Sequence, residues 1–284
     1  MPESADTREY IVPVSPDRFV LLHYHIFKNA GSTIENALRR CFGKRFATLH
    51  GPDANSILRG EDVAAFLLSH PEVAAISSHH VKYPKPVAPG LIVFDLCVLR
   101  DPLERLRSVY RHLRRAEPVD DLSARAKELD LRSFLDLLIR KHPHLVNDVQ
   151  VNILANGSAY TRPPGSADLA AALAIAGDMS AISVVDLFDE SLVAAEHFLQ
   201  PAFPSIQLAY ISQNVGPATG CAFRDEVGDP IYRQLQNLNQ LDGELVSRAR
   251  GEVRRRFGLV PDAQENLADF RQRCAALVRL GAAG

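Results

Sequence analysis

An apolar segment that runs straight into a short polar turn and then a helix constrains this chain more than any other feature. In RFVLLHYHIFKNAGSTIENALRR, Arg18 to Arg40, the run Phe19 to Ile26 is rich in β-branched and aromatic residues and predicts a buried strand. Ile34 and Leu38 then recur at helical spacing, which predicts a helix over Ser32 to Phe42. A strand followed at once by a helix is typical of parallel sheets that helices cover on both faces.

The same order of apolar run and helix recurs along the chain. Leu91 to Leu99 is the strongest strand, and Pro102 after it suits a first helical turn. The proline-rich segment Val81 to Gly90 is expected to be a loop. Further expected strands are Val73–Ser77, Ala181–Leu187 and Gln207–Ser212, and further helices are Leu129–Lys141, Ala167–Ala176, Glu190–Leu199 and the stretch from Pro230 onward, broken near Gly258–Pro261. We therefore expect one α/β domain over 17–284 with a central parallel sheet and a helical C-terminal part, preceded by a surface segment over 1–16.

Composition and charge narrow the class of protein. The 284 residues are 46% hydrophobic and 23% charged, as in ordinary globular proteins, and the net charge of −2 provides no general basic field for nucleic acid. No run approaches the roughly 20 apolar residues of a membrane span. The cysteines are far apart, without metal or redox spacing, and predict reduced thiols: Cys41, Cys97, Cys221 and Cys274. These features predict a cytoplasmic protein that does not bind nucleic acid, and they leave its oligomeric state open.

The first turn carries the residue types of an anion site. A helix that begins at the end of a strand exposes backbone N–H groups and the positive end of its dipole. Gly31 permits close approach of an anion, and the hydroxyl groups of Ser32 and Thr33 add donors. Lys28 adds a full charge, but it precedes the glycine, so the turn is not the G-x-x-x-x-G-K-[ST] loop of nucleoside triphosphatases.

A second turn repeats this arrangement in LIVFDLCVLRDPLERLRSVYRH. Arg100 lies at the carboxyl end of the strand that ends at Leu99, and Ser108 follows eight residues later, two helical turns on. The planar guanidinium and the hydroxyl can together bind one phosphate. Both turns are expected at the carboxyl edge of one sheet, where α/β folds bind ligands. The alternative is that Arg100 pairs with Asp101 or Glu104 at the surface.

Together the two turns resemble the sulfotransferases that use 3′-phosphoadenosine 5′-phosphosulfate (PAPS). HIFKNAGST resembles the 5′-phosphosulfate loop of that family, commonly His-Ile-Pro-Lys-Thr-Gly-Gly-Thr-Ser, and VLRDPLERLRSVY resembles its 3′-phosphate motif. The branch that this chain resembles contains heparan sulfate 2-O-sulfotransferase and related carbohydrate sulfotransferases. Three further segments resemble that branch in the same order, and the whole resemblance covers about residues 19 to 255: SSHHV (Ser77–Val81), NDVQVNILANG (Asn147–Gly157) and DLFDESLVAAEHFL (Asp186–Leu199).

The resemblance implies a P-loop-like domain and a role for each motif. Lys28 would assist the leaving phosphate, and Arg100 with Ser108 would bind the 3′-phosphate of the donor. No metal ion would be required. The residues that would bind the 5′-phosphosulfate are those of the loop: Lys28, Asn29, Ala30, Gly31, Ser32 and Thr33. The base segment implies His80 as the general base, with His79 as the reserve candidate, because a neutral imidazole suits proton abstraction near pH 7.

Four positions depart from the family pattern. Phe27 stands in place of the usual proline, Asn29 in place of threonine and Ala30 in place of glycine. None of these changes removes the lysine or the hydroxyl groups, so donor binding is still expected. Ser78 replaces the first histidine of the base segment, which leaves the identity of the base open.

The acceptor is less constrained than the donor. The resemblance favours the hydroxyl of a carbohydrate, and a peptide tyrosine or small phenol is the alternative. Lys82, Lys85 and Arg114 are candidates to line a groove for an anionic glycan. A P-loop kinase or a non-catalytic nucleotide-binding module ranks lower, because the lysine order differs and the strands end without a clear aspartate for Mg²⁺.

Overall fold

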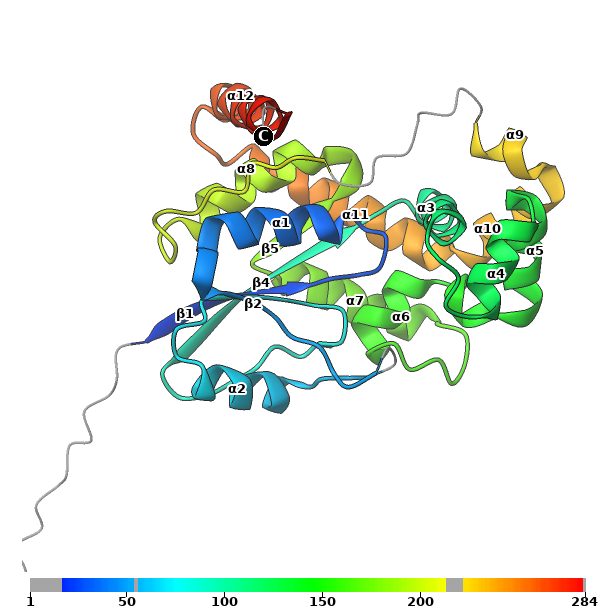
Figure 1. The fold of residues 1–284 in the computed structure, drawn as a ribbon, viewed down its shortest axis with the longest axis horizontal. Coiled ribbons are helices and arrows are strands. Elements are labelled where there is room, and N and C mark those ends of the chain that lie inside the picture. The colour runs from blue at the N-terminus through cyan, green and yellow to red at the C-terminus, as the bar shows by residue number, and fades with distance from the viewer. Residues whose placement is uncertain (1–16, 54–55, 213–221, 283–284) are drawn as a thin grey trace, which may run out of the picture.

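The computed structural model describes residues 17–53, 56–212 and 222–282, and Figure 1 shows a sheet with helices packed on both of its faces. The expected surface segment 1–16 and Cys221 lie outside the described residues. Within the described chain the sheet has five strands in the order β2-β3-β1-β4-β5, all parallel to their neighbours. They are β1 (Arg18–Tyr24), β2 (Phe46–Thr48), β3 (Ala75–Ser78), β4 (Leu91–Leu99) and β5 (Ala181–Val184). The expected α/β class is therefore confirmed.

The sheet is buried on both faces because its central strands are apolar at successive positions. Along β1, Leu21 packs into the core on one face, whereas Val20 and Leu22 pack into the core on the other. The first face is covered by α1 (Gly31–Phe42), α8 (Phe188–Leu199) and α12 (Ala263–Ala282). The second face is covered by α2 (Gly60–Ser69), α6 (Val149–Asn156), α7 (Ser166–Asp178) and α11 (Gln240–Phe257).

A third hydrophobic cluster joins further helices at one end of the sheet (Figure 1). Phe134 is fully buried in this cluster, which also contains Leu106 and Leu235 of other helices. Its helices are α3 (Pro102–Arg115), α4 (Asp121–Glu128), α5 (Leu131–Lys141), α9 (Phe223–Val227) and α10 (Asp229–Leu238). With α10, α11 and α12 in succession, the expected helical C-terminal part is confirmed. Short 3₁₀ turns occur at Gly43–Arg45, Pro143–Leu145 and Val185–Leu187.

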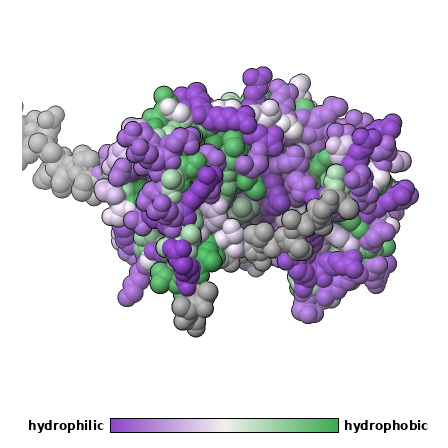
Figure 2. Space-filling view, turned by 90° about the horizontal axis from the view of Figure 1, so that it is seen from above, coloured by the Kyte–Doolittle hydropathy of each residue, from purple (hydrophilic) through white to green (hydrophobic). Residues whose placement is uncertain are grey.

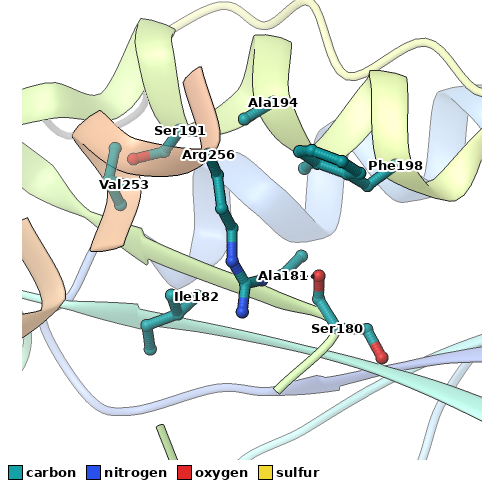
Figure 3. Close-up of a pocket in the computed structure, with 9 residues that line it drawn as sticks. Ser180, Ala181, Ile182, Ser191, Ala194, Phe198, Val253 and Arg256 are labelled. Atoms are coloured by element: carbon teal, nitrogen blue, oxygen red, sulfur yellow. Dashed lines mark hydrogen bonds between the residues drawn. The ribbon is translucent and has the colours of Figure 1, made fainter. Parts of the chain in front are cut away.

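Arg256 ties α11 to the sheet beside β5. Its Nη1 donates to the carbonyl oxygen of Ser180 at 2.8 Å, and its Nε donates to Glu252 at 2.6 Å. Figure 3 shows the side chain directed from α11 toward Ser180. Ser180 in turn donates to the buried carboxylate of Asp95 on β4 through its N–H at 2.8 Å and its hydroxyl at 2.9 Å. This chain of contacts holds α11 over the β4–β5 edge.

The strand expected at Gln207–Ser212 is wrong. Three of its N–H groups donate to side chains: Gln207 to the Cys41 thiol at 3.4 Å, Leu208 to the Glu196 carboxylate at 2.5 Å and Tyr210 to the Cys274 thiol at 3.3 Å. A β-ladder requires main-chain partners on a neighbouring strand, and within the described residues no strand is formed over this segment. The strand expected at Ala181–Leu187 is shorter than predicted, since β5 ends at Val184. The sequence analysis did not anticipate β2, α2, α4 or α6.

Among the described helices, none combines the length and the apolar composition needed to cross a bilayer. The face seen from above in Figure 2 is mostly hydrophilic, with hydrophobic residues in separate small areas.

Candidate active site

A cavity of about 530 Å³ opens at the carboxyl ends of β1, β3, β4 and β5. Because these strands are parallel, the segments that follow them meet at one edge of the sheet. Of the residues predicted for the site, those that line the cavity are Lys28, Ala30, Gly31, Ser32, Thr33, His79, Arg100 and Ser108. Asn29 and His80 do not line it. The structure thus brings together both predicted turns and one of the two candidate bases.

The turn between β1 and α1 presents free main-chain donors. Lys28 and Ala30 have positive φ angles of 66° and 59°, and Ala30 is the N-cap of α1 without a capping side chain. The first turn of α1 contains no acidic residue. Among the described residues, the N–H groups of Gly31 and Ser32 have no hydrogen-bond acceptor. This helix start is therefore ready to receive an anion.

Gly31 is required by its contact with His25. A Cβ atom at position 31 would lie 1.8 Å from Cδ2 and 2.0 Å from Nε2 of His25. The His25 ring is buried, and its Nδ1 lies 3.8 Å from Glu35 of α1. The His25 ring thus packs directly against the turn, and only glycine at position 31 leaves room for this ring.

Lys28 lies at the cavity without a carboxylate partner in the part of the chain that the structure describes. Its ammonium group is 5.6 Å from the centre of the Phe27 ring. Burial, together with the nearby charges of Arg100 and Arg115, lowers its pKa. A partly desolvated cation of this kind is poised to bind a negative group.

The turn between β4 and α3 presents side chains. Arg100 donates from Nη1 to the carbonyl oxygen of Lys28 at 3.0 Å, while its buried Nε has no acceptor among the described residues. The carboxylates expected as alternative partners are engaged elsewhere: Asp101 accepts from two N–H groups of its own helix, and Glu104 pairs with Arg107 at 3.0 Å. Arg100 is thereby left to face the cavity beside Ser108.

The sequence analysis missed further cations of the site. The described residues that line the cavity include one carboxylate, Glu104, against five cationic side chains: Lys28, Arg100, Arg107, Arg111 and Arg115. The last three follow one another at intervals of four residues along α3, and that spacing places them on one face of the helix. The interval was visible in the sequence, but the sequence analysis assigned none of these three arginines to the site. Lys82, Lys85 and Arg114 do not line this cavity.

The two candidate bases differ in the tautomer that their hydrogen bonds require. Nδ1 of His79 lies 2.8 Å from the carbonyl oxygen of His25, which can only accept, so Nδ1 carries the proton and Nε2 is basic. Nδ1 of His80 instead accepts from the N–H of Gly51 at 2.7 Å, so Nε2 carries the proton. Burial lowers the pKa of both rings. The His79 ring also lies against the His25 ring, with 3.6 Å between the ring centroids and 31° between the ring planes.

No family model matches the chain. An uncharacterized protein of Archaeoglobus fulgidus is 25% identical over 250 residues, and the match covers 80% of this chain and 94% of that protein. The similarity extends over most of both chains.

Proposed function

We propose that this protein is a sulfotransferase that moves the sulfuryl group of PAPS to an acceptor hydroxyl. The observation that carries the proposal is that two cationic turns, at the ends of adjacent strands, open into one cavity and touch through Arg100 and the carbonyl of Lys28. A donor with a 5′-phosphosulfate and a 3′-phosphate needs two such anion sites. The cavity volume of about 530 Å³ lies within the range of roughly 300–1,000 Å³ of ligand sites.

The residues have distinct roles in this proposal. The open start of α1, with Ser32 and Thr33, binds the 5′-phosphosulfate, and Arg100 with Ser108 binds the 3′-phosphate. A bond forms between the acceptor oxygen and sulfur while the bond from sulfur to the bridging oxygen breaks. The nucleotide 3′-phosphoadenosine 5′-phosphate (PAP) leaves with the electron pair of that bond. Lys28 stabilises the charge that develops on the leaving phosphate.

His79 is our candidate for the general base. His79 lines the cavity, its Nε2 is the unprotonated nitrogen, and its lowered pKa keeps the ring neutral near pH 7. His80, which the resemblance favoured, does not line the cavity and has Nδ1 occupied by Gly51. We therefore propose that His79 removes the proton from the acceptor hydroxyl.

We propose the hydroxyl of a carbohydrate as the acceptor, on the strength of the resemblance, with a tyrosyl peptide or small phenol as the alternative. Consumption of PAPS across a panel of glycans, phenols and tyrosyl peptides would distinguish them. A cytoplasmic location belongs to the same proposal, because the free thiols of Cys41, Cys97 and Cys274 suit a reducing compartment.

Thermal stabilisation tests the donor directly. PAP without metal should raise the melting temperature, since ligands that bind only the folded state stabilise it. ATP with Mg²⁺ is the matched comparison and should have the weaker effect. If ATP with Mg²⁺ stabilises the protein and PAP does not, the proposal is overturned in favour of a kinase.

A further inference from the structure

One buried amide joins the two phosphate-binding turns. Gln150 lies on α6, is 0% exposed and does not line the cavity. Its Oε1 accepts from Nδ2 of Asn29 at 2.8 Å and from the N–H of Arg100 at 2.9 Å. Its Nε2 donates to the carbonyl oxygen of Arg100 at 2.8 Å. The side chain therefore binds both the N–H and the carbonyl group of Arg100, which follows β4, while it also binds Asn29 in the loop after β1.

Asp242 of α11 sets the orientation of this amide. One of its carboxylate oxygens accepts from the N–H of Gln150 at 3.0 Å and lies 3.3 Å from Nε2 of Gln150, and the other accepts from the N–H of Val151 at 2.8 Å. The amide oxygen of Gln150 thus faces only donors and its nitrogen faces only acceptors, so a single orientation satisfies every contact. Asn29 also donates to the carbonyl oxygen of Val98 at 2.9 Å, which ties the loop to β4 a second time.

We propose that Gln150 is a positioning residue that holds the two turns at the separation required by a nucleotide with both a 3′- and a 5′-phosphate. The inference rests on the proposed function, because that function assigns one phosphate to each turn. When a nucleotide carries one phosphate, the turn that binds this phosphate can shift with the ligand, so the position of the other turn matters little. A nucleotide with two phosphates needs both turns in place at once, and it alone should depend strongly on the link between them.

The test compares three ligands on one variant. Gln150→Met keeps the size of the side chain and removes its hydrogen bonds. Three hydrogen bonds between the Gln150 side chain and the two turns are lost. We expect the affinity for PAP, measured by calorimetry, to fall on the order of tenfold, because the lost positioning should weaken binding by about as much as one net hydrogen bond. The affinities for adenosine 5′-monophosphate and adenosine 3′-monophosphate should change by about twofold or less on the same scale. Equal losses for all three ligands, or no loss for PAP, would overturn the inference.

Two further variants guard against a general effect of altering the core. Asn152→Leu alters a buried amide on the same helix, whose side-chain oxygen accepts from Asn156 at 3.2 Å, away from both turns. It should leave the preference for PAP unchanged. Asn29→Ala removes the loop side of the link while Gln150 still holds Arg100, and it should reproduce the selective loss of PAP affinity even if Gln150→Met folds poorly.

Hydrogen exchange separates this inference from the proposed function. In the protein without ligand, Gln150→Met should speed exchange of the Arg100 N–H, whose acceptor is the Gln150 oxygen. Unchanged exchange would overturn the link itself, whatever the ligand. A different outcome is also possible: the wild-type protein binds none of the three nucleotides, while Gln150→Met still exchanges the Arg100 N–H faster. This outcome would overturn the proposed function but would confirm that Gln150 links the two turns.

Discussion

The two turns that border the cavity start their helices in different ways. α1 begins behind Ala30, an N-cap residue with a positive φ and no capping side chain, and its first turn contains no acidic residue. α3 begins behind Asp101, whose carboxylate accepts from the N–H groups of Leu103 and Glu104, each at 3.0 Å. The main-chain donors are therefore open in the first turn and already occupied in the second.

This difference implies two kinds of anion site within one cavity. At α1 an anion can bind the main chain and the helix dipole, which no single side-chain substitution removes. At α3 an anion depends on the side chains of Arg100 and Ser108, because Asp101 holds the amides. The two turns thus share the order strand, turn and helix, but one offers main-chain donors to an anion and the other offers side-chain donors. Side-chain substitutions should therefore weaken anion binding more at the second turn than at the first.

The largest effect is expected at His79, which belongs to neither turn. His79→Ala should lower kcat by about 10²- to 10⁴-fold through loss of the general base, with PAP affinity nearly unchanged. His80→Ala is the matched control and should stay close to wild type, since that ring lies outside the cavity. Steady-state kinetics together with calorimetry would measure both quantities. Loss of activity in His80→Ala alone would move the base to the neighbouring residue.

The pH profile adds a second test of His79. A general base acts in its neutral form, and burial lowers the pKa of His79 below the ordinary value for histidine of about 6.5. The acidic limb of kcat should therefore lie below that value, with full activity retained through neutral pH. An acidic limb centred above about 6.5 would contradict the assignment.

Lys28 tests the first turn. Lys28→Ala should lower kcat by about 10²- to 10³-fold, as removal of a group that stabilises developing charge does in other enzymes. PAP affinity should fall less than kcat, because the open amides of α1 remain to bind the phosphate. Rapid-quench kinetics and calorimetry would separate the two effects. A loss confined to affinity would show that Lys28 binds the donor without assisting its departure.

Arg100 tests the second turn, where the main chain offers no substitute. Arg100→Ala should weaken PAP binding by about ten- to a hundredfold, which corresponds to about 1.5–3 kcal/mol for hydrogen bonds to a charged group. Arg114→Ala removes an exposed arginine of the same helix that does not line the cavity, and it is the control. Equal affinities for the two variants would remove Arg100 from the site.

Gly31 tests whether the shape of the first turn is as constrained as its contacts indicate. Gly31→Ala would force the buried His25 ring to move, and we expect a loss of about 1–3 kcal/mol in the free energy of unfolding. Gly251→Ala in α11 meets no atom within 4 Å and should gain about 0.5–1 kcal/mol, as alanine favours a helix. Denaturant melts would show both changes. A stable Gly31→Ala protein would mean that His25 does not support the turn.

Local features of the site were predictable from the sequence, and its long-range contacts were not. Apolar periodicity predicted β1, α1, β4 and the start of α3, because each depends on neighbouring residues. The choice between His79 and His80 depends on hydrogen bonds to His25 and Gly51, which are remote in sequence. Sequence spacing contains no information on such partners.

The same limit applies to the failed strand and to the link between the turns. Gln207–Ser212 has the composition of a strand, but three of its N–H groups donate to side chains of three helices, α1, α8 and α12. Gln150 lies 50 residues from Arg100 and 121 residues from Asn29 along the chain. The fold brings these groups together, and only then does the role of a buried glutamine become visible.

The smallest expected effect, at Asp101, sharpens the comparison between the turns most directly. Asp101→Ala removes the cap of α3 and should lower the free energy of unfolding by about 1 kcal/mol, as loss of an N-cap does. Donor affinity should be unchanged or slightly higher, because the freed amides and the lost negative charge both favour an anion near Arg100. Calorimetry with PAP, alongside denaturant melts, would measure both terms. A clear loss of affinity, in a variant that remains folded, would mean that Asp101 orients Arg100, and the second turn would then depend on its helix cap as much as on its side chains.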